Sequence, residues 1–247
     1  MKLNVIHVAF FLGAVILGIP AEKSEADTPS YARWLAVGDS ITQHGPDANL
    51  HWLGEPRGMA ASSLDQDYVH LLQRLLQSKD TGAAQEVKIV GRLGKLGAGT
   101  VTQVDTVLAD LSSWNADLVT IQLGENDRLA EVGPDGFERD YRSLVDALLG
   151  TAKRPVIVCT GVWSAGEQAD PANPLRYIRG SEARIKDDII EKICREKGLI
   201  FVPIAPIAAV PENHGDGEDP GVRWHPNDKG MLAYANAIFE ALYPAGN

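Results

Sequence analysis

Short apolar runs alternate with stretches of helical periodicity along this chain, and this alternation constrains the fold more than any other feature of the sequence. Five runs have the length and composition of buried strands: Arg33–Val37, Glu86–Val90, Leu118–Leu123, Pro155–Thr160 and Leu199–Pro203. Between and after them, apolar residues recur at the i, i+3, i+4 spacing of helices that pack on a sheet: Tyr68–Leu76, Val101–Leu111, Gly136–Leu149, Ser181–Lys197 and Asn227–Leu242. The element order is therefore βαβαβαβαβα.

Repeated βαβ units with right-handed crossovers produce a parallel sheet with helices on both faces. We predict an α/β fold of three layers, α/β/α, that is flavodoxin-like, with a five-stranded parallel sheet in the order 2-1-3-4-5. A chain of 247 residues with 45% apolar residues can bury one substantial core, so we expect a single catalytic domain over residues 27–247. Ligands of such sheets bind at the carboxyl ends of the strands.

Unusual polar and glycine clusters follow the predicted strands at those ends. Asp39-Ser40 follows the first strand, three glycines (Gly91, Gly94 and Gly97) follow the second, and Gly124-Glu125-Asn126-Asp127 follows the third. His225 lies just before the last predicted helix. Segments that are distant in the sequence thus converge on one edge of the predicted sheet, as a nucleophile, a base and oxyanion donors require.

Ser40 and His225 are the pair that this topology can bring together for nucleophilic catalysis. A serine hydroxyl is a poor nucleophile until a neighbouring imidazole removes its proton. The oxyanion formed on attack needs donors, and the candidates are the backbone N–H groups of Ser40 and Gly97 and the side-chain amide of Asn126. Taken singly, each residue has a plainer interpretation as a helix cap or a turn residue. Their joint occurrence in this order favours the catalytic interpretation.

Four segments carry a resemblance to a known family: Gly38-Asp39-Ser40-Ile41-Thr42, Gly97, Gly124-Glu125-Asn126-Asp127 and His225-Pro226-Asn227. In this order they resemble the four blocks of the SGNH, or GDSL-type, hydrolases. The resemblance implies Ser40 as the nucleophile, His225 as the base, and Ser40, Gly97 and Asn126 as the oxyanion hole. It also implies an esterase that uses no metal or other cofactor.

The sequence departs from the family pattern at the group that orients the histidine. The family usually places an aspartate three residues before the histidine, and that position is Val222 here. Asp216, Glu218 and Asp219 lie in the same loop, and a backbone carbonyl such as that of Val222 is another acceptor for the Nδ1 proton. We favour Asp219 as the third member of the triad.

Aromatic residues near the predicted site suggest a carbohydrate substrate. Trp52 lies in a long loop after the first strand. Trp163 follows the fourth strand, and Trp224 directly precedes His225. Tryptophan faces stack on sugar rings, although each of these residues is equally well explained as a core or loop anchor. His44 and His51 have no third ligand patterned with them, so we predict no metal site.

We therefore expect a serine esterase that removes small acyl groups, acetyl above all, from a small-molecule or polysaccharide ester. Two alternatives remain open. A lipase or lysophospholipase would need a long apolar trough, which no loop is apolar enough to predict. A carbohydrate-binding protein without catalytic activity is compatible with the missing aspartate.

The N-terminus has the pattern of a signal peptide over residues 1–26. Lys2 precedes an apolar run, Val5–Ile19, that is short for a membrane span, and small residues near Ala26 fit a cleavage site. We expect a secreted or periplasmic protein without stable membrane insertion after cleavage, a retained anchor being the alternative. The net charge of −10 argues against nucleic acid as a partner. The sequence leaves the oligomeric state open, and we expect Cys159 and Cys194 to be buried free thiols.

Overall fold

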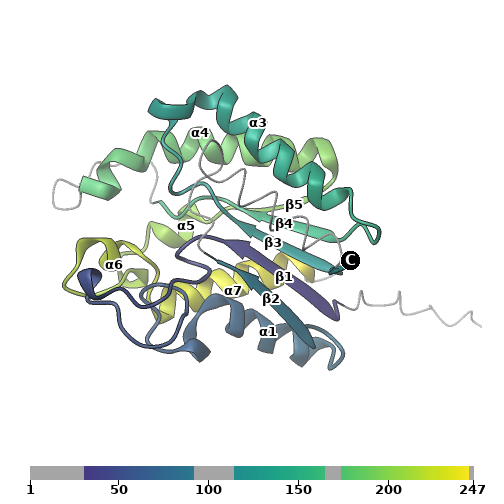
Figure 1. Cartoon of the computed structure of the whole chain (residues 1–247), viewed down its shortest axis with the longest axis horizontal. Coiled ribbons are helices and arrows are strands. Elements are labelled where there is room, and N and C mark those ends of the chain that lie inside the picture. The colour runs from purple at the N-terminus through teal and green to yellow at the C-terminus, as the bar shows by residue number, and fades with distance from the viewer. Residues whose placement is uncertain (1–30, 92–113, 165–173, 245–247) are drawn as a thin grey trace, which may run out of the picture.

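The protein forms a single parallel sheet in a computed structural model that describes residues 31–91, 114–164 and 174–244. The strands are β1 (Arg33–Gly38), β2 (Glu86–Val90), β3 (Leu118–Gln122), β4 (Val156–Thr160) and β5 (Ile200–Val202). All four pairings are parallel and the order is β2-β1-β3-β4-β5 (Figure 1). The predicted fold class and strand order are confirmed.

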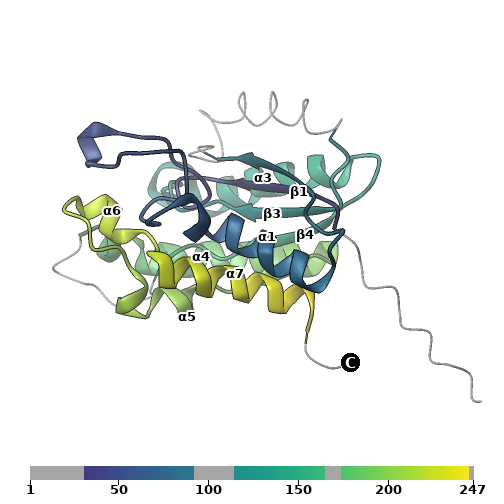
Figure 2. The same cartoon turned by 90° about the horizontal axis from the view of Figure 1, so that it is seen from below.

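Helices cover both faces of this sheet (Figures 1 and 2). Helices α1 (Tyr68–Lys79) and α7 (Asp228–Leu242) lie on one face, and α3 (Leu129–Leu149) and α4 (Pro174–Lys197) lie on the other. Shorter helices lie in the connections: η1 (Ala48–Leu50), η2 (Leu64–Gln66), α5 (Ala205–Ala208), η3 (Pro211–Asn213) and α6 (Pro220–Trp224). Helix α6 lies on the side of the molecule that holds the carboxyl ends of the strands, at the left of Figure 1.

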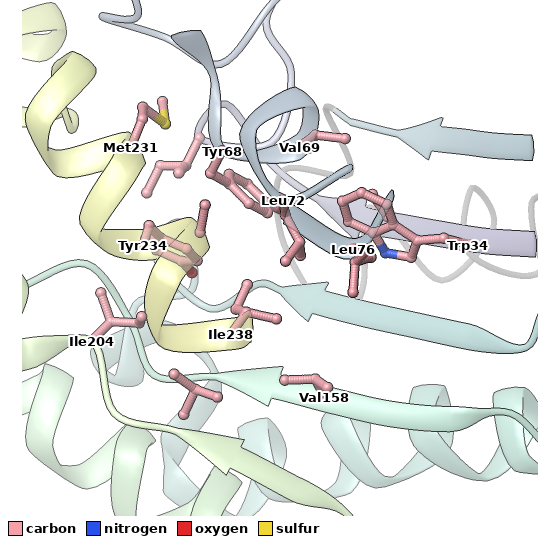
Figure 3. Close-up of a cluster of buried hydrophobic side chains, with 14 of the residues drawn as sticks. Trp34, Tyr68, Val69, Leu72, Leu76, Val158, Ile204, Met231, Tyr234 and Ile238 are labelled. Carbon is pink, nitrogen blue, oxygen red and sulfur yellow. The ribbon is translucent and has the colours of Figure 1, made fainter. Parts of the chain in front are cut away.

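The apolar faces of α1 and α7 meet the sheet in one of two main core clusters (Figure 3). Leu72 of α1, Tyr234 and Ile238 of α7, and Trp34 of β1 are all fully buried there. Complete burial of one such side chain stabilises the fold by about 1.5–3 kcal/mol. The second cluster packs α3 and α4 against the opposite face and contains Cys159 and Cys194, which are buried and not joined to each other. The i, i+3, i+4 apolar pattern is thus explained by burial against the sheet.

The structure differs from the predicted elements where local chemistry overrides periodicity. Helix α3 begins seven residues before the predicted start, because a short helical segment precedes the predicted one. The two segments meet at a break formed by Gly133, whose φ is +70°, and the following Pro134. Helix α6 was not predicted, because five residues are too few to show periodicity. The predicted helix Val101–Leu111 lies outside the described residues. None of the described helices is both long and apolar enough to cross a membrane.

Candidate active site

Ser40 lies in a tight turn directly after β1. The carbonyl of Asp39 accepts hydrogen bonds from the backbone N–H groups of Thr42 and Gln43, so the chain reverses as the strand ends. Gly38 is required before this turn, because a Cβ at that position would lie 1.9 Å from Oγ1 of Thr42. The turn leaves Ser40 half-buried at the carboxyl end of the sheet.

The structure brings Ser40 and His225 together across 185 residues of sequence. Oγ of Ser40 lies 2.8 Å from Nε2 of His225, within hydrogen-bond distance. Nδ1 of the same ring lies 2.6 Å from the carbonyl oxygen of Gly221. A carbonyl oxygen only accepts, so Nδ1 carries the proton of the neutral ring and Nε2 is left as the acceptor for the Ser40 hydroxyl. The ring is thereby held in the tautomer that a general base needs.

The described acceptor for Nδ1 is the Gly221 carbonyl, whereas the carboxylate of Asp219, the predicted third member of the triad, caps a helix. Asp219 is the N-cap of α6, and its Oδ1 accepts from the N–H groups of Gly221 and Val222 at 2.7 and 3.3 Å. The backbone N–H of His225 donates to the carbonyl of Val222, three residues before it, and not to the carbonyl of Gly221, four residues before it. The Gly221 carbonyl thus faces the imidazole side chain.

The other acidic residues of this loop are also directed elsewhere. Glu218 is largely exposed and lies 3.9 Å from Nδ1 of His51, which is also exposed, and Asp216 lines a surface cleft. The side chain of Val222 packs in a small apolar cluster with Trp52 and Met59. The position at which the family usually has an aspartate is thus part of a buried apolar contact in this protein.

Asn126, a predicted oxyanion donor, lies beside the nucleophile turn. Its Nδ2 atom donates to Oδ2 of Asp39 at 3.3 Å, which links the loop after β3 to the loop after β1. An amide nitrogen has two N–H groups, so this bond leaves a second one for a ligand. The turn that carries Asn126 depends on Gly124, whose φ is +128°. Gly97, the other predicted donor, lies outside the described residues.

Two polar residues that sequence reasoning missed support these loops. The side-chain oxygen of Gln122 accepts from the N–H of Asp39 at 3.2 Å and from the Thr42 hydroxyl at 2.9 Å. Lys186 of α4 is 2% exposed and donates from Nζ to the carbonyl of Gly124 at 2.8 Å. The available signals were a glutamine at the end of a buried strand and a lysine on the sheet-facing side of a helix.

Two buried carboxyl groups, those of Asp39 and Glu125, and the partly buried one of Asp187 lie behind the site. Burial raises the pKa of Asp39 well above its ordinary value, and the neighbouring Glu125 raises it further by its charge and by a side-chain hydrogen bond. Burial also raises the pKa of Asp187 to about 7, although the N–H of Val162, which donates to it at 2.8 Å, opposes that shift. The region behind Ser40 is therefore poor in solvent and rich in acidic groups.

The tryptophans predicted to bind sugar do not all lie at the surface. Trp163 is fully buried in the core, with its backbone N–H on Glu125 and its ring N–H on the carbonyl of Trp224. Trp224 is 5% exposed and packs edge-on against His225. The Trp163 side chain is therefore closed off from solvent, and that of Trp224 is almost so. Trp52 is also mostly buried, but it lines a cleft.

This cleft, of about 370 Å³, lies between the long loop after β1 and the loop before α6. Its wall is mainly polar or small: His51, Trp52, Leu53, Arg57, Ala60, Ala61, Ser62, Gly215, Asp216, Gly217 and Val222. The guanidinium of Arg57 lies 4.0 Å from the centre of the Trp52 ring. The N–H of Met59 donates to the carbonyl of Ser40, so this loop is tied to the nucleophile turn.

Solved structures of other proteins share this architecture. Axe2, an acetylxylan esterase from Geobacillus stearothermophilus, matches with a TM-score of 0.57 and 20% identity, covering 87% of this chain and 96% of that one. LAE5, an alpha/beta hydrolase enzyme from the metagenome of Lake Arreo, Spain, matches with a TM-score of 0.60 and 18% identity, covering 88% and 98%. At these identities the likeness shows the shared fold. No curated protein matches the chain.

The family model described as GDSL-like Lipase/Acylhydrolase matches residues 36–233. The matched range contains the Ser40 turn, the Asn126 loop and His225, and it spans most of the chain. The protein therefore belongs to the GDSL-like lipase/acylhydrolase, or SGNH, family.

Proposed function

We propose that the protein is a serine esterase that removes small acyl groups, acetyl above all, from carbohydrate hydroxyls through an acyl-enzyme intermediate. Family membership implies an acylhydrolase acting on an ester. The observation that carries the mechanism is the 2.8 Å contact between Ser40 and His225, in a ring whose tautomer is fixed by Gly221.

In the acylation step, Nε2 of His225 takes the Ser40 hydroxyl proton as Oγ attacks the ester carbonyl carbon. The carbonyl oxygen becomes an oxyanion, for which the second N–H of Asn126 and the backbone N–H of Ser40 are the described candidate donors. The imidazolium then gives its proton to the leaving alcohol oxygen, and the acyl group remains on Oγ.

In the deacylation step, His225 takes a proton from water, the hydroxide attacks the acyl carbon, and Ser40 recovers its proton as the acid leaves. Throughout the cycle Nδ1 of His225 keeps its proton and donates it in a hydrogen bond to the Gly221 carbonyl oxygen. This acceptor is neutral, so it orients the imidazolium without contributing the full charge that a carboxylate would supply. The working unit is a Ser40–His225 dyad supported by a backbone carbonyl.

The character of the cleft supports a hydroxyl-rich alcohol portion rather than a long acyl chain. Arg57, Ser62 and Asp216 offer hydrogen-bonding groups along its wall, and its apolar members are few. The acetylxylan esterase whose fold this chain shares acts on an acetylated polysaccharide according to its own description. Trp52 remains our candidate for contact with a sugar, through the part of its ring that borders the cleft.

Release of acetate from acetylated xylo-oligosaccharides, compared with hydrolysis of p-nitrophenyl palmitate, tests this proposal. We expect acetate release by the wild-type protein and by Ser78→Ala, which alters an exposed serine of α1, and none by Ser40→Ala. Circular dichroism of the three proteins checks that each is folded. A preference for the palmitate ester would contradict the proposed substrate, and full activity of folded Ser40→Ala would contradict the mechanism.

We also propose that the protein is exported after removal of residues 1–26. Mass spectrometry of the protein purified from its natural host is expected to give a mature N-terminus at Asp27. A cell-associated protein that retains Met1 or Lys2 would contradict export.

A further inference from the structure

Two carboxyl side chains lie against each other directly behind the candidate oxyanion hole. Asp39 follows β1 and Glu125 follows β3, and these two strands are paired in parallel, so both residues emerge at the same edge of the sheet. Asp39 is 1% exposed and Glu125 is 4% exposed. Their side chains lie within hydrogen-bond reach of each other. A pair of acids in this position has no solvent to separate its charges.

The hydrogen bonds around the pair leave one oxygen without a donor. Asp39 accepts from the N–H of Ile41 at Oδ1 and from Asn126 at Oδ2, at 3.1 and 3.3 Å. Oε1 of Glu125 accepts from the N–H of Trp163 at 2.8 Å. Oε2 of Glu125 is buried and has no donor among the residues that the structure describes. A buried carboxylate oxygen beside a second carboxylate is satisfied when a proton lies between them.

Among the residues that the structure describes, the ionisable groups that interact with this pair or with each other beside it bring one positive charge against the two negative ones. They are Tyr68 of α1, Tyr234 of α7, and Asp187 and Lys186 of α4. Burial raises the pKa of both tyrosines, so they stay neutral, and Asp187 adds negative charge when it ionises. Lys186 is the single cation in this group, and its ammonium donates to the Gly124 carbonyl.

We propose that Asp39 and Glu125 hold one proton between them at neutral pH and act together as positioning residues for Asn126. The pair then carries one negative charge, and Oδ2 of Asp39 fixes the Asn126 amide with its second N–H directed away from the pair. Loss of the shared proton puts a second negative charge beside the place where the oxyanion forms, which disfavours the transition state. This kinetic consequence rests on the proposed esterase function.

The variant Glu125→Gln tests whether loss of the shared proton lowers kcat. The glutamine amide donates permanently to Asp39 while its oxygen accepts from Trp163, so the variant imitates the protonated pair. We expect the fall in kcat at alkaline pH to disappear in this variant and to persist in Glu240→Gln, which alters an exposed residue of α7. If kcat depends on alkaline pH in the same way in the wild-type protein and in Glu125→Gln, the proposal is overturned.

Asp39→Asn provides the opposite perturbation. The asparagine oxygen must accept from Ile41, so its amide nitrogen faces the amide nitrogen of Asn126, and two donors then oppose each other. We expect kcat to fall roughly tenfold or more with little change in KM, because an interaction made in the transition state is lost. An unchanged kcat in folded Asp39→Asn would show that Asp39 does not position Asn126.

Carbon-13 NMR of the side-chain carboxyl groups in the whole protein measures the shared proton without reference to activity. We expect the wild-type protein to show a carboxyl signal in its protonated position at pH 7 that is absent in Glu125→Gln and retained in Asp187→Asn. Ionised signals for both acids at pH 7 would overturn the proposal. If the wild-type protein hydrolyses no ester, the proposed function fails, and the NMR signal still decides whether the pair shares a proton.

Discussion

Asp187 gives this protein a pH-dependent stability that a single substitution should remove. Its side chain extends from α4 to the loop after β4, where Oδ1 accepts from the N–H of Val162 at 2.8 Å. Burial, together with the charges of Glu125 and Asp188, raises the pKa of Asp187 from 3.8 to about 7. Asparagine at this position keeps an oxygen for Val162 and does not ionise.

The sign and size of the effect follow from this pKa. Because the folded-state pKa is raised, the folded protein binds the proton more tightly than the unfolded chain. The corresponding stability is present below the unfolded pKa of 3.8 and is lost as the pH rises towards about 7. A difference of about 3 pKa units at about 1.4 kcal/mol each gives about 4 kcal/mol as an upper estimate.

Urea unfolding between pH 4.5 and pH 8 measures this loss. We expect the free energy of unfolding of Asp187→Asn, relative to the wild-type protein, to improve steadily as the pH rises over this interval. Asp135→Asn, which alters an exposed residue of α3, is the matched control and should follow the wild-type curve. Parallel curves for Asp187→Asn and the wild-type protein would show that the Asp187 carboxyl does not bind a proton more tightly in the folded state.

The remaining predictions concern the loops that carry the site. Asn126→Ala should lower kcat by about 10²–10³ through loss of an oxyanion donor, measured with p-nitrophenyl acetate; an unchanged kcat would remove it from the oxyanion hole. Asp219→Ala should lower the free energy of unfolding by about 1 kcal/mol through loss of the α6 cap, and should lower kcat because the Gly221 carbonyl shifts; unaltered kinetics would separate the cap from His225. Val222→Asp should destabilise the protein in urea without raising kcat, whereas a higher kcat would show that the dyad gains from a carboxylate.

The fold was predictable because its signals are local and repeated. Five apolar runs separated by amphipathic stretches specify a parallel sheet, and the burial of Leu72, Tyr234 and Ile238 against it shows why those stretches have helical periodicity. The boundaries of α3 were less predictable. A glycine with positive φ allows two helical segments to continue across a break, and periodicity alone does not reveal this.

The site was predictable where its residues follow strand ends and less so where backbone or burial decides the role. Ser40, Asn126 and His225 carry their chemistry in side chains, so motif and topology together indicated them. The acceptor for His225 is a backbone carbonyl, which any residue type at position 221 would supply, and no sequence pattern identifies it. The burial of Trp163 is likewise set by tertiary packing, which composition does not reveal.

The central claim is that Ser40 is a nucleophile activated by His225, and active-site labelling with a fluorophosphonate probe tests it most directly. Peptide mapping by mass spectrometry should place the label on Ser40 in the folded wild-type protein, with no label in Ser40→Ala and much slower labelling in His225→Gln. Labelling at another residue, or no labelling of the folded wild-type protein, would contradict the account.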